Sequence, residues 1–159
     1  MKHIVGVADM VISAKCDDQI ITHALGSCLG ITVYDPVAKV GGMLHVMLPL
    51  SSIDTKKASE NPYMFVDTGV PRLFLECYKL GAQKQRLSVK VAGGASTGGD
   101  REDFFQIGKR NFVALRKLLW KNGVLIDAYE VGGTDSRTIS LDIATGELTL
   151  RANGSSTLL

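Results

Sequence analysis

The chain has 159 residues, of which 45% are hydrophobic and 21% are charged. This length and balance predict one globular domain spanning residues 1–159 and exclude an intrinsically disordered chain. The 18 Lys and Arg residues against 16 Asp and Glu residues leave a net charge of +2 without a basic cluster, so nucleic acid is not an expected partner.

The sequence contains no targeting or metal-binding pattern. No stretch is apolar enough to cross a membrane, and Asp9 interrupts the apolar N-terminus, which argues against a signal peptide. Three cysteines without CxxC spacing argue against a disulfide framework and against a Cys-rich zinc site. We therefore expect a cytoplasmic protein that needs no metal, no other cofactor and no membrane insertion.

Short segments rich in Val, Ile, Thr and Met dominate the first third of the chain and are bounded by Gly, Asp or Pro, a pattern typical of β-strands. The predicted strands are His3–Ile12, Gln19–Leu25, Leu29–Tyr34 and Gly42–Leu48. A polar loop, Ser51–Asn61, follows them.

Helical periodicity appears next. Apolar residues recur at helical spacing over Gly69–Leu80, with Thr68 as the expected N-cap and Gly81 as the expected end. A strand over Leu87–Ala92 leads into the glycine-rich segment GGASTGGD, and a second helix is predicted over Ile107–Lys121.

The last third of the chain returns to strand patterns. The segments LIDAYEV and RTISLDIATGELTLRA predict strands that end in a hairpin at Thr145-Gly146, and residues 151–159 are expected to form a loose tail. Strands, helix, strand, helix and strands in this order predict an α+β domain with two main helices flanking the sheets.

Cys28 is the candidate nucleophile. Gly26 and Ser27 form a tight bend directly before a strand, which exposes a side chain while the backbone N–H groups of Ser27 and Cys28 face a developing oxyanion. Because a thiol also needs a base, the histidine on the following strand, His45, is the candidate partner.

The turn Asp35-Pro36-Val37-Ala38 connects these two strands and leaves two registers open. A two-residue loop at Pro36-Val37 sets Cys28 directly opposite His45, whereas a loop from Pro36 to Lys39 makes them diagonal neighbours. Either register brings a thiol and an imidazole within reach of each other, because paired and diagonal Cβ atoms lie about 4.5–8 Å apart.

A catalytic histidine usually needs an orienting group, and Thr22, on the strand that enters the bend, is the candidate. The structural alternatives are a packed core histidine at His45, a small buried hydrophobe at Cys28 and simple β propensity at Thr22. We assign such a core role to Cys77, on the apolar face of the first helix. The glycine-rich segment lacks both P-loop and dinucleotide-binding spacing, so close backbone approach is its expected role.

Several separated motifs together resemble one known family. THALGSCLGITVYDP, GGMLHVMLP, KVAGGAS, IGKRN, EVGGTDSRTI and ATGELTLR are similar, in this order, to segments of the chemoreceptor glutamine deamidases, the CheD family. The resemblance extends over nearly the whole chain.

The resemblance implies a catalytic cysteine at Cys28, a histidine at His45 and an assisting threonine at Thr22. It implies a β-sandwich-like core with outer helices, like that of the toxin deamidases related to cytotoxic necrotizing factor. It also implies that glutamines of methyl-accepting chemoreceptors are the substrates and that a CheC-type phosphatase is a partner.

Two loops depart from the family pattern. GGAS continues as TGGDRED, and Ser136 stands where glycine is common. We expect the first loop to form the substrate rim, through Gly93, Gly94, Ala95 and Ser96. A binding module that regulates a CheC-type phosphatase, and a cysteine hydrolase acting on another amide, are the competing interpretations.

Overall fold

The computed structural model describes residues 1–96 and 106–159, which form two five-stranded sheets. In spatial order, the first sheet contains β1 (Lys2–Ile4), β3 (Gln19–Leu25), β8 (Arg137–Asp142), β9 (Leu148–Ala152) and β10 (Ser155–Leu158). The second sheet contains β2 (Asp9–Ser13), β5 (Val40–Val46), β4 (Leu29–Asp35), β6 (Ser88–Gly93) and β7 (Ala128–Val131).

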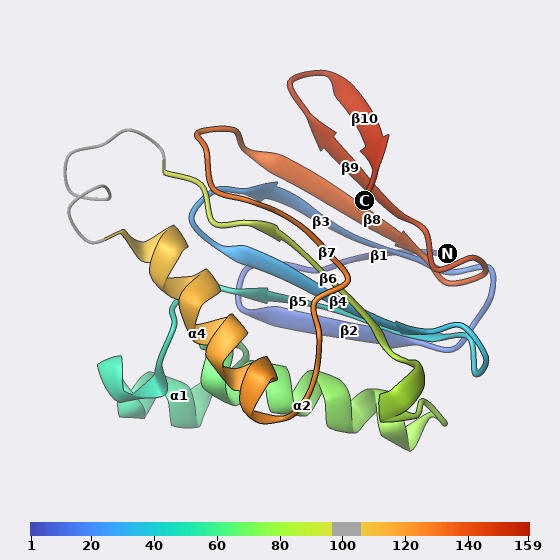
Figure 1. Cartoon of the computed structure of the whole chain (residues 1–159), viewed down its shortest axis with the longest axis horizontal. Coiled ribbons are helices and arrows are strands. Elements are labelled where there is room, and N and C mark those ends of the chain that lie inside the picture. The colour runs from blue at the N-terminus through green and yellow to red at the C-terminus, as the bar shows by residue number, and fades with distance from the viewer. Residues whose placement is uncertain (97–105) are drawn as a thin grey trace.

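The sheets lie in two layers, and the helices lie beyond the second sheet (Figure 1). These helices are α1 (Thr55–Glu60), α2 (Val66–Lys79) and α4 (Ile107–Lys121), and short 3₁₀ turns occupy Ser51–Ile53, Pro62–Met64 and Lys84–Arg86. The pairs β1–β3 and β6–β7 are parallel and the other strand pairs are antiparallel, so both sheets are mixed. The predicted α+β class is confirmed.

Two apolar clusters hold the layers together. One lies between the sheets and combines Ile20 and Ile139 of the first sheet with Met43 of the second. The other joins the second sheet to α2 and α4, through residues such as Leu44 and Leu115. Every residue of β4 and β5 is buried because these strands are covered on both faces, and each fully buried Leu or Ile contributes roughly 1.5–3 kcal/mol.

The predicted single strand His3–Ile12 is wrong. The structure divides it into β1 and β2, which belong to different sheets, and Ala8 adopts a positive φ of 56° between them. The Val5 N–H still bonds to Ile21 O in the first sheet, whereas the Ala8 N–H bonds to His45 O in the second. The chain therefore crosses between the layers over residues 5–8.

The region around α2 also differs from the prediction. The helix begins at Val66, three residues before Gly69, and Thr68 does not cap it: its hydroxyl donates to Pro62 O at 2.5 Å. The polar stretch before it contains α1, whose N-cap Asp54 accepts from the Lys57 N–H. The predicted end is confirmed, because the Gly81 N–H bonds to Tyr78 O with a positive φ of 103° at Gly81.

The segment 151–159 is not a loose tail. Arg151 and Ala152 belong to β9, and β10 pairs with that strand through residues 155–158. The Leu159 N–H also bonds to Leu148 O, and Lys90 Nζ donates to Leu159 O. Backbone pairing thus orders a segment whose side chains are mostly exposed and carry little periodicity.

Within residues 1–96 and 106–159, no helix is both long and apolar enough to cross a membrane. The same part of the chain contains no group of three or more His, Cys, Asp and Glu side chains arranged to hold a metal ion.

Candidate active site

The β4–β5 hairpin has the longer of the two expected loops. Its ladder runs from Leu29–Val46 to Asp35–Val40, so Pro36 to Lys39 form the connection. The buried Asp35 carboxylate fixes this turn by accepting from the Val37 and Ala38 N–H groups, and it pairs with Arg86 at 2.9 Å. Although burial alone would raise the pKa of Asp35, the Arg86 guanidinium and these N–H groups hold it well below its usual range.

Cys28 lies directly before β4. Continuing the register one step beyond Leu29–Val46 sets Cys28 across from Met47, so His45 is its diagonal neighbour on the same face of the sheet. The half-buried Cys28 side chain packs against the cluster between the sheets, which includes Met43, two residues before His45. The register therefore brings the predicted nucleophile and base to one place, in the diagonal arrangement.

Three successive carbonyl groups of the bend are held by other segments. Gly26 O accepts from the Ala95 N–H at 2.8 Å, and Cys28 O accepts from the Gly94 N–H at 2.9 Å. Between them, Ser27 O accepts from Asn111 Nδ2 at 3.0 Å. Because the C=O and N–H of a trans peptide point in opposite directions, these bonds also fix the directions of the Ser27 and Cys28 N–H groups. These are the two predicted oxyanion donors.

Thr22 and His45 meet across the two sheets. The distance between Thr22 Oγ1 and His45 Nδ1 is 2.7 Å, and Thr22 Oγ1 also lies 2.8 Å from Val5 O. The carbonyl can only accept, so the threonine hydroxyl donates its one hydrogen to Val5. His45 Nδ1 must then carry a hydrogen and donate it to Thr22, and in a neutral ring this leaves Nε2 without one.

Burial determines the charge of this histidine. The His45 side chain is 2% exposed, and this desolvation lowers its pKa below the ordinary value. His45 is therefore a neutral imidazole at pH 7, with Nδ1–H anchored and Nε2 available as a proton acceptor. A residue in this state can act as a general base.

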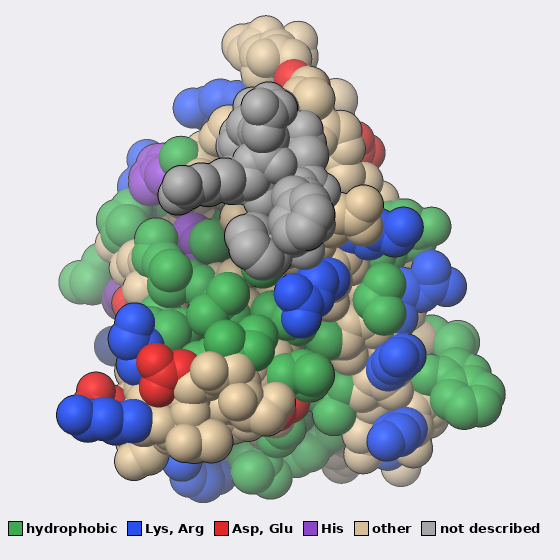
Figure 2. Space-filling view, turned by 90° about the vertical axis from the view of Figure 1, so that its left-hand side faces the viewer, with side chains coloured by type: hydrophobic (Ala, Val, Ile, Leu, Met, Phe, Trp, Pro, Cys, Tyr) green, Lys and Arg blue, Asp and Glu red, His purple; other side chains and the backbone are tan. Residues whose placement is uncertain are grey.

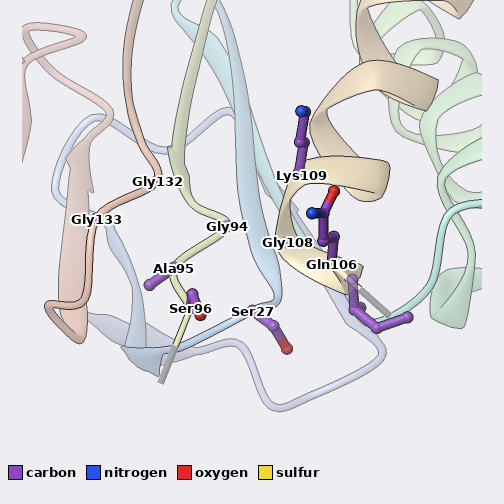
Figure 3. Close-up of a pocket in the computed structure, with 10 residues that line it drawn as sticks. Ser27, Gly94, Ala95, Ser96, Gln106, Gly108, Lys109, Gly132 and Gly133 are labelled. Carbon is purple, nitrogen blue, oxygen red and sulfur yellow. The ribbon is translucent and has the colours of Figure 1, made fainter. Parts of the chain in front are cut away.

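The glycine-rich segment lies beside the bend. Gly94, Ala95 and Ser96 line a cavity of about 380 Å³ together with Ser27, Gln106–Lys109 and Gly132-Gly133 (Figure 3). Ala95 is only 2% exposed, so a bulky charge there would disturb packing before it met any substrate, whereas the Ser96 side chain is half-buried. Residues 97–100 of this segment lie outside the described residues.

Two glycines permit the close approach of this segment. Gly93 has a φ of 114°, and a Cβ there would clash with the carbonyl oxygen of Cys28. A Cβ at Gly108, in the first turn of α4, would clash with Gly94 O. The bend, the loop after β6 and the start of α4 are therefore in direct backbone contact.

The sequence patterns do not predict two further residues of this site, Arg137 and Asn111. Arg137 is buried and donates to Gly93 O at 3.0 Å and to Gly132 O at 2.8 Å, so it holds the loops that line the cavity. Asn111, also fully buried, donates to Ser27 O and to Met47 O, each at 3.0 Å. Both lie within motifs that carried the family resemblance, but their spacing from Cys28 along the chain gives no signal of contact.

The other two cysteines have different surroundings. Cys77 is completely buried, and desolvation raises the pKa of its thiol to about 12, which fits the predicted core role. Cys16 is exposed in the turn between β2 and β3.

Comparison with known proteins identifies the family. Residues 47–152 match the family described as CheD chemotactic sensory transduction. A probable chemoreceptor glutamine deamidase CheD of Solibacter usitatus (strain Ellin6076) is 52% identical over 151 residues, which cover 95% of this chain and 89% of that protein. A probable chemoreceptor glutamine deamidase CheD 1 of Syntrophus aciditrophicus (strain SB) is 49% identical over 151 residues, covering 95% and 94%.

Similarity extends to less closely related sequences. A probable chemoreceptor glutamine deamidase CheD of Pyrococcus abyssi (strain GE5 / Orsay) is 42% identical over 148 residues, which cover 92% of this chain and 89% of that protein. The family match begins at Met47, but the similarity to these relatives extends over almost the whole chain and so includes the β4–β5 hairpin. The chain belongs to the CheD family.

Proposed function

We propose that this chain hydrolyses the side-chain amide of specific glutamines on methyl-accepting chemoreceptors, leaving glutamate and releasing ammonia. The observation that carries this proposal is the hydrogen bond from His45 Nδ1 to Thr22, which leaves Nε2 as the acceptor beside the strand end that bears Cys28. The names of the similar proteins, each a probable chemoreceptor glutamine deamidase, supply the substrate class.

The chemistry takes two steps. In the first, Cys28 Sγ attacks the glutamine carboxamide carbon while its proton passes to His45 Nε2, and the Ser27 and Cys28 N–H groups stabilise the oxyanion. The imidazolium then protonates the leaving nitrogen, the C–N bond breaks, and ammonia departs from a thioester. In the second step, His45 takes a proton from water as the water oxygen attacks the thioester carbon, and it returns that proton to Sγ as the C–S bond breaks, which gives glutamate and the free thiol.

The thiol, the imidazole, the backbone N–H groups and the attacking water supply every proton and charge in this scheme, so the proposed reaction uses no metal and no other cofactor. The two-layered sheet core with outer helices agrees with the sandwich-like fold of toxin deamidases related to cytotoxic necrotizing factor. We propose a cytoplasmic location, because the substrate glutamines belong to the cytoplasmic part of the receptors.

A basic groove suggests how a protein substrate is held. A hollow of about 490 Å³ lies between Pro49-Leu50 and α4, and four basic side chains and one carboxylate make up its charged lining: Lys109, Arg110, Lys117, Lys121 and Asp67. It shares Gln106 and Lys109 with the cavity beside Ser27. Figure 2 shows apolar side chains gathered on this end of the molecule, with a column of Lys and Arg side chains on the right of the view and others on the left.

We propose that an acidic surface of the receptor lies along this basic groove while its glutamine side chain reaches Cys28. A CheC-type phosphatase partner would bind to the same basic groove and compete with the receptor. Competition predicts a raised apparent KM for the receptor with an unchanged maximal rate when such a partner is added.

The experiment that tests the proposed function is incubation of the full chain with a recombinant cytoplasmic fragment of a chemoreceptor. Mass spectrometry locates Gln-to-Glu conversion, and an ammonia assay separates hydrolysis from transamidation. Cys28→Ala should abolish conversion without unfolding the protein, and His45→Ala should lower turnover by roughly 10²–10⁴. Conversion by Cys28→Ala at the rate of the unaltered chain would exclude this function for the thiol.

A further inference from the structure

The end of the β4–β5 ladder is closed by a side chain from α4. The last backbone pair of the hairpin is Leu29–Val46; Met47 follows Val46 directly, and Ser27 lies two residues before Leu29. Asn111 Nδ2 donates one hydrogen to Ser27 O and one to Met47 O, each at 3.0 Å. One amide group thus joins the bend that bears Cys28 to the strand that bears His45.

The orientation of this amide is fixed by its partners. Both Nδ2 hydrogens face carbonyl oxygens, and a flipped amide would set Oδ1 against these two acceptors. Oδ1 is buried, and among the residues that the structure describes it has no hydrogen-bond partner. Burying an unpaired acceptor is unfavourable, so any favourable contribution of this amide comes from its two donors.

The bond to Ser27 O acts on the proposed oxyanion donor. Ser27 O and the Cys28 N–H belong to one planar peptide and point in opposite directions. Holding the carbonyl against α4 therefore aims the Cys28 N–H away from the helix. The carbonyl groups of the two neighbouring peptides accept from the Ala95 and Gly94 N–H groups, whereas the carbonyl of the middle peptide accepts from the Asn111 side chain.

We propose that Asn111 is a positioning residue, which orients the Ser27–Cys28 peptide for oxyanion stabilisation and keeps Cys28 in register with His45. The proposal rests on the proposed function, since it assumes that a tetrahedral oxyanion forms at Cys28. Loss of the two donors removes the bond that sets the direction of Ser27 O, so the N–H of the same peptide shifts away from its place during attack. Misplacement of about 1 Å in such a site lowers kcat by roughly 100-fold.

The test compares Asn111→Ala and the isosteric Asn111→Asp with the unaltered chain. An ionised aspartate cannot donate and repels both carbonyls, whereas a protonated one donates a single hydrogen bond. The carboxyl introduced by Asn111→Asp faces two carbonyl acceptors, Ser27 O and Met47 O, which favours its protonated form and raises its pKa. The ratio of kcat in Asn111→Asp to kcat in the unaltered chain should therefore rise as the pH falls, while KM for the receptor fragment stays the same.

Alkylation of Cys28 by iodoacetamide supplies a second readout, in a Cys16→Ser background that removes the exposed thiol. Alkylation forms no oxyanion, so its rate should fall much less than kcat in both variants. Asn122→Asp is the matched control at the C-cap of the same helix: Asn122 Nδ2 donates to Leu118 O at an exposed position, and kcat should not change. If Asn111→Ala does not fold, the pH series of Asn111→Asp decides.

Unchanged kcat in Asn111→Asp at every pH overturns the proposal. A fall in thermal stability with kcat and alkylation lowered in parallel, and no pH-dependent recovery, also overturns it, because a merely structural role predicts that pattern. Cys28→Ala, assayed beside these variants, distinguishes failure of the proposed function from failure of the positioning role. If it retains activity, the proposed function fails; if it is inactive while Asn111→Asp behaves normally, only the positioning role fails.

Discussion

The hydrogen bond between Thr22 and His45 makes the substitution Thr22→Val a sharp test of the site. Valine has almost the same shape as threonine but neither donates nor accepts. The substitution leaves His45 Nδ1–H and Val5 O without their present partner, at positions where both residues are 2% exposed. An unsatisfied buried polar group costs roughly 1–3 kcal/mol, so with two such groups the free energy of unfolding should fall by roughly 2–6 kcal/mol.

Activity should fall for a separate reason. Without the threonine, the hydrogen can move from Nδ1 to Nε2, and a ring protonated at Nε2 cannot accept the thiol proton. A hydrogen bond worth about 1–1.5 kcal/mol biases the tautomers by about 5- to 12-fold. The lost orientation of the ring adds to this bias, so we expect kcat to fall by roughly 10- to 100-fold.

The assay combines urea unfolding, receptor-fragment turnover and long-range ¹H–¹⁵N NMR, which reports which ring nitrogen of His45 carries hydrogen. Thr32→Val is the matched control. Thr32 is 2% exposed on β4 and donates one hydrogen bond to Lys90 O at 3.2 Å, so its loss should cost about 1 kcal/mol and leave kcat unchanged. Equal turnover in the two variants, or an Nε2–H tautomer in the unaltered protein, would refute the reasoning.

Four other predictions follow from named contacts. Cys77→Ala should lower the free energy of unfolding by roughly 1 kcal/mol and leave turnover unchanged. Iodoacetamide should leave the native Cys77 thiol unmodified because burial raises its pKa to about 12. Labelling of Cys77 in the native protein would contradict this prediction. Gly93→Ala should abolish turnover because its Cβ would clash with Cys28 O. Gly81→Ala has a similar positive φ but nothing near its Cβ, so it should lower stability alone. Equal turnover of the two variants would refute the clash argument. The Ser13 hydroxyl and His3 lower the pKa of Asp18 to about 2. The stability that its carboxylate contributes above about pH 4 is therefore lost as the pH falls toward 2. In acid unfolding, the difference in stability between the unaltered chain and Asp18→Asn should shrink over that pH range. The double substitution Lys117→Glu and Lys121→Glu should raise KM for the receptor fragment without slowing Cys28 alkylation. Lys79→Glu, which lies outside the groove, should leave KM unchanged. Equal KM values for the double variant and Lys79→Glu would exclude the groove as the docking surface.

Local sequence patterns determined much of this protein. The apolar runs and the turn at Asp35-Pro36 predicted the β4–β5 hairpin, and the hairpin alone made Cys28 and His45 neighbours in either register. Helix α4 has the predicted bounds, since its periodicity and its end at Asn122-Gly123 are local signals. These features depend on residues close together in the chain, where spacing and side-chain type carry the information.

Tertiary structure decided the rest, because it depends on pairing between distant segments. The hairpin register follows from a four-residue loop, which no local pattern distinguished from the shorter one. Residues 3–12 divide between two sheets because β1 pairs with β3 and β2 pairs with β5, and a strand pattern does not specify its partner. Asn111 lies 84 residues from Ser27 along the chain, and it contacts the bend because α4 packs against the loop after β6. A side chain that closes a ladder from another layer leaves no periodic signal, so only the folded protein reveals it.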